Sequence, residues 1–411
     1  FNRLILSAGL DWRQTGVIRA YSRYLKQLGI RFGQIYVSET LNAHADVTRL
    51  LVELFQSRFQ PKLAKRESAI VAIEEKIDEA LDKVSSLDAD RILRSFRNVI
   101  NATLRCNYYQ IDEHEQPASY YSFKIATGSL HEAPRPRPAY EIWVHSPRFE
   151  AVHLRGGKVA RGGLRWSDRP EDFRTEILGL VKAQIVKNAV IVPVGAKGGF
   201  VCRKPPSGND RQAHQQEAIA CYRLFMTAML DLTDNLVEGK VVAPKQLVRW
   251  DDDDPYLVVA ADKGTASFSD IANEIAIERG FWIGDAFASG GSNGYDHKKM
   301  GITAAGAWES VKRHFRELGT DIQKQPFSVI GIGDMSGDVF GNGMLMSPHI
   351  QLKAAFNHLH IMIDPNPDAE LSFKERQRQF NQVSHWGDYD TSTLSKGAGI
   401  WSRSENSIKP S

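Results

Sequence analysis

The chain has 411 residues, a mass of 46.1 kDa and a formal net charge of +3, from 52 basic and 49 acidic residues. A chain of this length is longer than a single hydrophobic core usually accommodates, so we predict two or three domains. The nearly balanced charge gives no reason to expect a nucleic acid or a membrane surface as a partner.

Only three cysteines occur, Cys106, Cys202 and Cys221, and none of them forms a CxxC pattern. We therefore expect neither a metal site nor a disulfide framework, and a reducing, cytoplasmic setting fits. No apolar run approaches the roughly 18 residues of a membrane span, and no signal peptide opens the chain. Because the sequence begins with Phe1 rather than Met, we expect a fragment of a longer protein.

Residues 2–105 have the periodicity of amphipathic helices, interrupted at Gly29, Pro61 and the polar stretch 85–90. Apolar stripes at this spacing are typical of core or interdomain packing, so we expect no catalytic group here. Three such stripes contain Val17, Ile18, Tyr21, Leu25 and Leu28; Val47, Leu50, Leu51, Leu54 and Phe55; and Ile70, Ile73, Ile77, Leu81 and Val84.

From Ser119 the pattern changes to the alternation that is typical of β-strands. The segment AYEIWVHSPRFEAVHLRGGKV indicates a hairpin that leads into Arg161. This region continues as an alternation of helices and strands, which predicts a sheet covered by helices. Helices are predicted over residues 171–187 and 215–233, and short buried strands over 190–194 and 256–261.

A third region follows a glycine-rich turn at residues 290–294. A helix is predicted over 303–318, FSVIGIGDMSGDVFG indicates a buried strand that enters a glycine-rich turn, and a second buried strand, HIMID, ends at Asp364. This order is the opening of a dinucleotide-binding unit, but only about one βαβ unit is present. The sequence thus predicts an α/β protein with a helical region (1–115), an α/β substrate-binding catalytic domain (116–300) and an incomplete Rossmann-type dinucleotide-binding domain (301–411).

The stretch 161–200 gathers cations and glycines, which predicts a site for a carboxylate substrate. Lys197, in VGAKGGF, would polarise a carbonyl or help a water to attack; the alternative is a surface lysine in a turn. Lys187 would hold a carboxylate together with Lys197. The alternative is that Lys187 has no such function, since the helix dipole alone favours a cation at the end of a helix. Arg161 and Arg165 flank a Gly-Gly pair, and each has a planar guanidinium group that can bind a carboxylate with two hydrogen bonds. We expect one of the two arginines to have a structural role.

Asp262 stands where a predicted buried strand ends, which is the usual place for functional groups in α/β sheets. Near those lysines it would move protons at a carbon that bears an amine; the alternative is an aspartate that caps a helix or turn. We interpret the acidic run 251–254 as a solvated loop rather than a metal site.

The glycine-rich turn of the third region matches part of a dinucleotide fingerprint. Ser336 stands at the third glycine position, and Asp364 lies farther on than the usual ~20 residues. An acid at a strand tip favours a ribose 2′-hydroxyl and hence NAD over NADP; the alternative is a glycine turn in some other α/β domain. The predicted cofactor-binding residues are Gly331, Gly333, Asp334, Met335, Ser336, Gly337 and Asp364.

Four segments, RGGLRWSDR, KAQIVKNAVIVPVGAKGGF, VVAADKGTA and GIGDMSGDVFGNGML, resemble the large bacterial NAD-specific glutamate dehydrogenases, and the resemblance covers nearly all of the chain. It implies oxidative deamination of L-glutamate to 2-oxoglutarate and ammonia with NAD, in a full-length protein that we expect to be a homo-oligomer. By the same resemblance Lys197 activates water, Asp262 handles protons on the amine and imine, and Lys187 holds the α-carboxylate. Arg161 falls where the smaller glutamate dehydrogenases have a lysine that recognises the side-chain carboxylate.

Two alternatives stay open. A dehydrogenase for another, apolar amino acid on the same fold would need no second cation. A non-catalytic NAD-binding or scaffold protein is favoured by the incomplete Rossmann domain.

Overall fold

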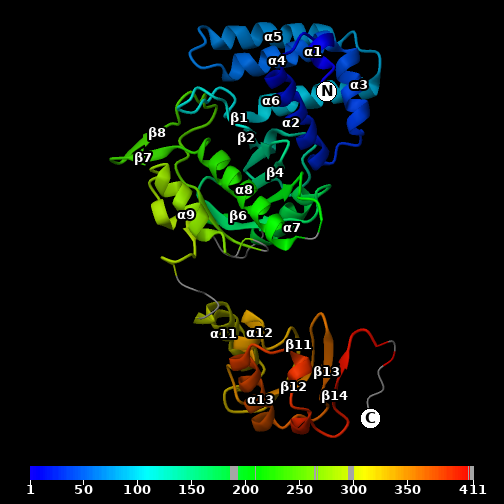
Figure 1. The fold of residues 1–411 in the computed structure, drawn as a ribbon, viewed down its shortest axis with the longest axis vertical. Coiled ribbons are helices and arrows are strands. Elements are labelled where there is room, and N and C mark those ends of the chain that lie inside the picture. The colour runs from blue at the N-terminus through cyan, green and yellow to red at the C-terminus, as the bar shows by residue number, and fades with distance from the viewer. Residues whose placement is uncertain are drawn as a thin grey trace. The chain divides into compact units, whose positions relative to one another are not determined.

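The computed structural model describes residues 1–185, 193–208, 210–262, 265, 267–294, 300–405 and 407. The chain forms two compact units, residues 1–294 and 295–411 (Figure 1). The predicted boundary between residues 300 and 301 lies close to this division. The predicted boundary between residues 115 and 116 has no counterpart, because the N-terminal helices share one hydrophobic core with the sheet that follows them.

The first unit begins with the helices that the periodicity predicts. In α2, Gln14 N donates to the Asp11 carboxylate at 2.7 Å and so caps the first turn, while Gly29 ends the helix at φ 93°. None of the helices in the described ranges is both long and apolar enough to span a membrane. The first six are α1 (Leu4–Ser7), α2 (Trp12–Leu28), α3 (Gln34–Ala43), α4 (Ala45–Phe59), α5 (Arg66–Leu81) and α6 (Leu87–Ala102).

A mixed sheet follows, with the strand order β1-β2-β3-β4-β6-β5-β9-β10. The predicted hairpin is confirmed as β3 and β4, which pair antiparallel, whereas β6, β5, β9 and β10 run parallel. Parallel pairing brings the carboxyl ends of β5 and β9 to one edge. The strands are β1 (Thr103–Cys106), β2 (Tyr121–Ala126), β3 (Tyr140–His145), β4 (Phe149–Arg155), β5 (Ala160–Trp166), β6 (Val194–Cys202), β9 (Val258–Ala261) and β10 (Ala288–Ser289).

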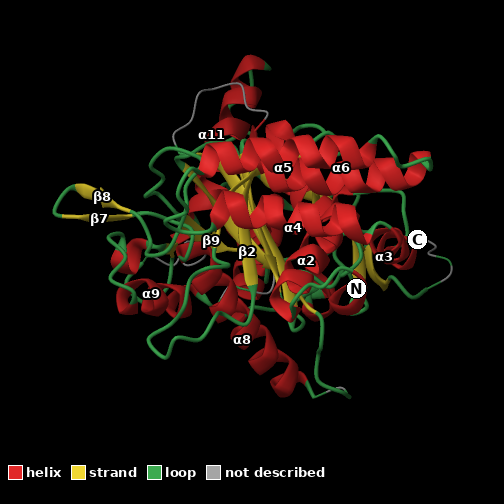
Figure 2. Ribbon diagram, turned by 90° about the horizontal axis from the view of Figure 1, so that it is seen from above, coloured by secondary structure: helices red, strands yellow, loops and turns green. Residues whose placement is uncertain are grey.

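Helices cover both faces of this sheet, as predicted. The N-terminal helices and α7 (Phe173–Ile185) share a core with side chains such as Trp143, and α2, α4 and α6 lie over the strands in Figure 2. The other face carries Leu164 and packs on α8 (Arg211–Leu230) and α9 (Ser269–Glu278). A separate hairpin of β7 (Asn235–Val237) and β8 (Lys240–Val242) projects from the unit (Figure 1).

The acidic run 251–254 is only partly the solvated loop that we predicted: Asp252 and Asp253 are exposed, but the side chains of Asp251 and Asp254 are buried. Asp254 is only 2% exposed and accepts from Arg155 Nη1 at 2.7 Å, and Asp251 accepts from Arg105 Nε at 2.6 Å. These bonds attach the segment that leads into β9 to strands β1, β2 and β4, since Lys124 on β2 contacts both carboxylates. We call this set the buried ion cluster: Arg105, Lys124, Arg155, Asp234, Asp251 and Asp254.

The second unit contains a four-stranded sheet in the order β11-β12-β13-β14. The helix predicted over 303–318 is confirmed as α11 (Ile302–Glu317), which is followed by α12 (Asp338–Gly343) and α13 (Ala369–Gln382). The strands are β11 (Phe327–Ile332), β12 (Ile350–Phe356), β13 (His360–Ile363) and β14 (Gly399–Ser402). Short 3₁₀ helices in the two units are η1 (Thr127–Ser129), η2 (Gly284–Ala286), η3 (Trp386–Asp388) and η4 (Thr391–Thr393).

This sheet differs from the predicted unit in two ways. The prediction missed β12, which is the strand that runs parallel to β11, whereas the predicted second strand is β13 and runs antiparallel to β12. The prediction of a fully buried β11 is wrong, because this strand is at the edge of the sheet and Ile330 and Ile332 are each 77% exposed.

Candidate active site

Lys197 lies within strand β6, so it is not the surface lysine in a turn that the sequence left as the alternative. β6 pairs with β4 on one side, where Lys197 is opposite Leu154, and with β5 on the other. The neighbouring glycines make room for packing: a Cβ on Gly198 would lie 2.5 Å from Leu164 Cδ2, and one on Gly199 2.6 Å from Ile177 Cδ1. They let α7 and β5 approach the strand that carries the lysine.

Lys197 and Asp262 form an ion pair across two strands. Lys197 Nζ donates to Asp262 Oδ2 at 2.7 Å, and each side chain is 16% exposed. Asp262 follows the last residue of β9, as predicted, and β5 separates the two partners in the sheet. Gly163 on β5 leaves the space between them, because a Cβ there would lie 3.1 Å from both Lys197 Nζ and Asp262 Cβ.

Arg165 binds two carboxylates of the protein. Its Nη2 donates to Asp262 Oδ1 at 3.1 Å and its Nη1 donates to Glu176 Oε1 at 2.8 Å. Burial would lower the pKa of Arg165, but the hydrogen bonds that it donates to Glu176 and Asp262 outweigh burial and raise that pKa. The fork of this arginine is therefore directed to the protein, so Arg165 is the one of the two arginines that has a structural role rather than the predicted role in holding substrate.

Arg161 is a cation of this stretch that the described residues leave unpaired. It is exposed, and among the described residues it has no hydrogen-bond or ion-pair partner. The alternation of β5 places it on the same face as Gly163 and Arg165, towards the side of the sheet that carries Lys197. Lys187, the other predicted carboxylate ligand, lies outside the described residues.

The arrangement offers a cation and a carboxylate that meet at a partly exposed face. A lysine ammonium at this position would polarise a carbonyl oxygen, and the adjacent carboxylate would accept or return a proton. No group of three or more His, Cys, Asp or Glu side chains suited to a metal ion occurs in the described ranges.

In the second unit the glycine-rich turn is organised by Asp334. Its Oδ1 accepts from Ser336 N at 3.0 Å, and its Oδ2 accepts from Asn357 Nδ2 at 2.6 Å. Burial would raise the pKa of Asp334, but these bonds and one from His385 hold it at about 2, so the carboxylate is ionised. Gly333 adopts φ +136°, and its carbonyl accepts from Trp386 Nε1 at 2.7 Å.

Asp364 does not join this turn, which corrects its predicted place. The Gly333 amide bonds to Phe356 O at the end of β12, but β13 then runs back, and Asp364 N bonds to Lys353 O. Three residues of strand, about 10 Å, separate those two levels of β12. Asp364 instead accepts from Ser395 Oγ and from Asn366 N.

Sequence reasoning missed the groups that act through others, namely Glu176, Ser167, Asn357 and His385. A glutamate in the first turn of a helix is favoured by the helix dipole alone, so Glu176 carries no signal of its own. Its role is visible only in the structure, where Ser167 Oγ donates to Glu176 Oε2 at 2.6 Å and Arg165 Nη1 donates to Glu176 Oε1.

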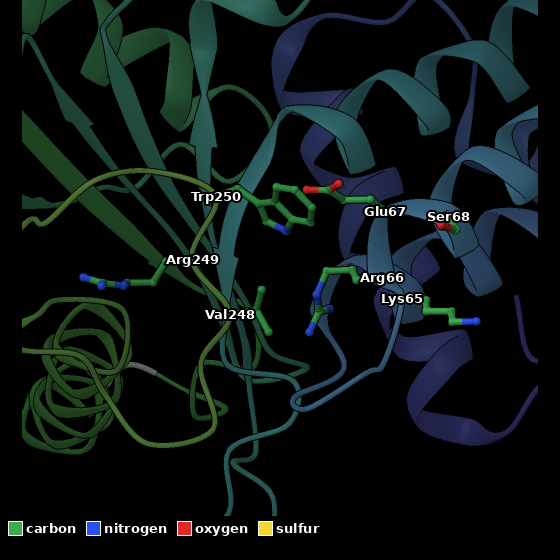
Figure 3. A pocket seen from close by; sticks show the side chains of 7 residues that line it. All are labelled: Lys65, Arg66, Glu67, Ser68, Val248, Arg249 and Trp250. Carbon is green, nitrogen blue, oxygen red and sulfur yellow. The ribbon is translucent and has the colours of Figure 1, made fainter.

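A hollow of about 460 Å³ lies elsewhere in the first unit, at the start of α5 (Figure 3). Trp250 and Val248 face it from one side and Arg66 and Glu67 from the other, while Arg249 and Lys65 point away from it (Figure 3). None of the predicted site residues lines it.

Comparison with known proteins identifies what the chain is similar to. The model of the bacterial NAD-glutamate dehydrogenase catalytic domain matches residues 76–411, and that of glutamate dehydrogenase helical motif 3 matches residues 1–61. NAD-specific glutamate dehydrogenases of Halomonas elongata and Pseudomonas aeruginosa are 62% and 63% identical over 409 and 415 residues. Each alignment covers 99% of this chain, but the chain spans only 25% and 26% of those proteins.

Among solved structures, the crystal structure of Plasmodium falciparum glutamate dehydrogenase aligns with 95% of this chain and 65% of its own. Its sequence identity is 13% and its TM-score 0.36, so the superposition is too loose to place residues of a site.

Proposed function

Because the chain belongs to the family of bacterial NAD-glutamate dehydrogenase catalytic domains, we propose that the protein of which it is a part oxidises L-glutamate to 2-oxoglutarate and ammonia with NAD. The relatives that carry this activity in their names are about four times as long as the chain. The proposal for this chain is that it supplies the reacting groups.

Lys197 and Asp262 carry the chemistry in this proposal. In its amine form, Lys197 would accept a proton from the water as the water attacks the imine carbon, and the ammonium so formed would then donate a hydrogen bond to the new hydroxyl oxygen. Asp262 would take a proton from the substrate ammonium before oxidation and return one to the leaving amine afterwards. Their contact at 2.7 Å, with both side chains 16% exposed, is the single observation that carries this assignment.

Two cations would hold the substrate. Arg161 is exposed and without a partner among the described residues, so its planar guanidinium is available to the side-chain carboxylate of glutamate. We propose Lys187 for the α-carboxylate on the strength of the family resemblance alone. Arg165 is left out of the substrate-binding set, since it already binds Asp262 and Glu176.

The second unit would hold NAD, which supplies the hydride acceptor when it is bound. The turn from Gly331 to Gly337 fits this role in two respects. The glycines let β11 approach α12 closely, since a Cβ on Gly331 would lie 2.4 Å from Phe340. The ionised Asp334 holds the turn in shape through its bonds with Ser336 and Asn357, and with Met335, Ser336 and Gly337 it forms the proposed cofactor-binding loop.

The test is an assay of NADH formation from L-glutamate by the full-length protein with Lys197→Ala beside the parent. We expect the variant to lose at least ~10²-fold in kcat. Lys182→Ala is the matched control, because Lys182 is an exposed lysine of α7 and should leave the rate unchanged. A Lys197→Ala variant that keeps the parental rate would overturn the assignment.

The rival substrates are separated by Arg161→Ala. If glutamate is the substrate, this variant raises KM for glutamate and gains no preference for leucine. Activity on leucine that exceeds that on glutamate, unaffected by Arg161→Ala, would instead favour a dehydrogenase for an apolar amino acid. Titration calorimetry that shows NAD binding without any turnover would favour a scaffold.

We further propose that the full-length protein is a cytoplasmic homo-oligomer. Light scattering of the purified full-length protein tests the assembly, and fractionation of its cells tests the location.

A further inference from the structure

The Asp262 carboxylate is divided between two cations on different strands. Its Oδ2 accepts from Lys197 on β6 at 2.7 Å, and its Oδ1 accepts from Arg165 on β5 at 3.1 Å. Rotation of the carboxylate would break both charge-assisted bonds, so the positions of the two cations constrain its orientation.

Arg165 is in turn divided between two carboxylates. Its second amino group donates to Glu176 Oε1 at 2.8 Å, and Ser167 Oγ donates to the other oxygen of that glutamate at 2.6 Å. Burial alone would raise the pKa of Glu176, but the bonds from Ser167 and Arg165 lower it, so this glutamate is a full negative charge that competes with Asp262 for Arg165.

Glu176 is on a fixed element. Two residues earlier in the first turn of α7, Arg174 donates to both oxygens of Glu141 on β3, at 2.7 Å each, and both side chains are 0% exposed. Since a buried bidentate pair is costly to break, the start of α7 is held against the sheet, and Glu176 is held with it.

From this chain of contacts we infer that Arg165, Glu176 and Ser167 are positioning residues for Asp262, and that the charge of Glu176 sets how Asp262 is shared between Arg165 and Lys197. The inference rests on the proposed function only for its kinetic readout. Among the described residues, the charged groups that face Asp262 are Lys197 from β6 and Arg165 from β5, with Glu176 from α7 facing it across Arg165.

Two variants should move the acid limb of the pH profile in opposite directions. In Glu176→Gln, Asp262 is the remaining carboxylate that binds Arg165, so the ionised form of Asp262 is favoured. The acid limb of the kcat/KM profile should therefore move to lower pH by about one unit. Arg165→Met removes a cation from Asp262, so the limb moves to higher pH. Glu176→Asp keeps the charge and should restore the limb towards that of the parent.

Asp172→Asn is the matched control. It removes a carboxylate from the same β5–α7 connection, but Asp172 pairs with Arg169 at the surface, where the two side chains are 48% and 50% exposed. The control should leave the limb where the parent has it. A limb that stays in place in Glu176→Gln, or that moves in the same direction in both variants, would overturn the inference.

A second readout needs no turnover and so separates this inference from the proposed function. Acetic anhydride acetylates only the free amine of a lysine, and mass spectrometry of the full-length protein reports the rate at Lys197. Glu176→Gln draws Asp262 towards Arg165 and should speed acetylation of Lys197, whereas Arg165→Met leaves Asp262 to Lys197 and should slow it. Equal rates in the parent and both variants would contradict the inference even if the parent proves inactive on glutamate.

Discussion

Gly162 and Gly163 are adjacent on β5, but the structure needs them for different reasons. A Cβ on Gly162 would lie 1.5 Å from the carbonyl oxygen of Ala196, which is backbone of the next strand. A Cβ on Gly163 would lie 2.9 Å from the carbonyl oxygen of Ala261 and 3.1 Å from Lys197 Nζ, the far end of a flexible side chain. The first glycine is therefore required by the packing of β5 on β6, and the second by both the pairing of β5 with β9 and the position of the ion pair.

Alanine at these two positions should separate stability from activity. Gly162→Ala forces two strands apart and should cost at least about 1–3 kcal/mol of stability. Gly163→Ala makes a milder backbone contact, at 2.9 Å from Ala261 O, and should cost less stability, but it should displace Lys197 and lower kcat by roughly 10²-fold, since such losses follow a misplacement of about 1 Å. Melting temperature and kcat are measured together, with Gly179→Ala as the control because nothing lies within 4 Å of its Cβ. A fully active Gly163→Ala variant would show that the pair is not where the reaction occurs.

Strand β9 depends on the buried ion cluster, which fixes the segment before it. The cluster joins residues that are 99 to 146 positions apart in the sequence, such as Arg155 with Asp254 and Arg105 with Asp251. Since β9 ends one residue before Asp262, this cluster sets the height at which the carboxylate meets Lys197.

Removal of one cation from the cluster should be far more costly than removal of a surface cation nearby. Arg155→Met leaves Asp254 buried without its bidentate partner and should destabilise the region by about 3–5 kcal/mol. Lys158→Met removes an ion pair whose carboxylate, Asp252, is 93% exposed, and should cost less than about 1 kcal/mol. Hydrogen exchange of the β9 amides at increasing urea measures the loss of stability in each variant. Equal losses of stability in Arg155→Met and Lys158→Met would contradict the role of the cluster.

The same cluster predicts a loss of stability in acid. Burial would raise the pKa of Asp254, but Arg155 and Lys124 lower it from 3.8 to about 2. A depressed folded-state pKa stabilises the fold above the unfolded value, so this contribution, about 2 kcal/mol, is present above pH 4 and lost as the pH falls towards 2. Asp254→Asn should be less stable at pH 7 and should lack this part of the pH dependence in the same exchange experiment.

At the level of the whole chain, the sequence predicts more of the fold than of the contacts. Apolar periodicity identifies α2, α4, α5 and α11 because each helix buries one stripe, and Asp262 is placed at a strand end because the preceding run is apolar. The glycines beside Lys197 look like a turn in the sequence, although they make room for Leu164 and Ile177.

Partners from distant segments account for what the sequence does not predict. The run 251–254 looks solvated until Arg105, Lys124 and Arg155 are brought to it by three strands. Glu176 looks like an ordinary helix-start glutamate until Arg165 and Ser167 contact it. Asp364 looks like the acid of a dinucleotide unit, but the strand before it runs antiparallel.

The two units should respond to different ligands in the full-length protein. Each has a core of its own, and the proposed substrate and cofactor residues are in different units. In hydrogen-exchange mass spectrometry we expect 2-oxoglutarate to protect peptides from β5 and β6, and NAD to protect peptides from residues 327–337. Protection by NAD that is confined to the first unit would contradict the assignment of the glycine-rich turn.

The most direct test of the central claim is transfer of deuterium from L-[2-²H]glutamate to NAD, followed by mass spectrometry of the reduced cofactor. The account predicts that the full-length parent forms deuterated NADH and that Asp262→Asn, which keeps the size of the side chain but not its charge, forms it at least ~10²-fold more slowly. Formation of deuterated NADH by Asp262→Asn at the parental rate would contradict the claim that the Lys197–Asp262 pair is the reacting centre.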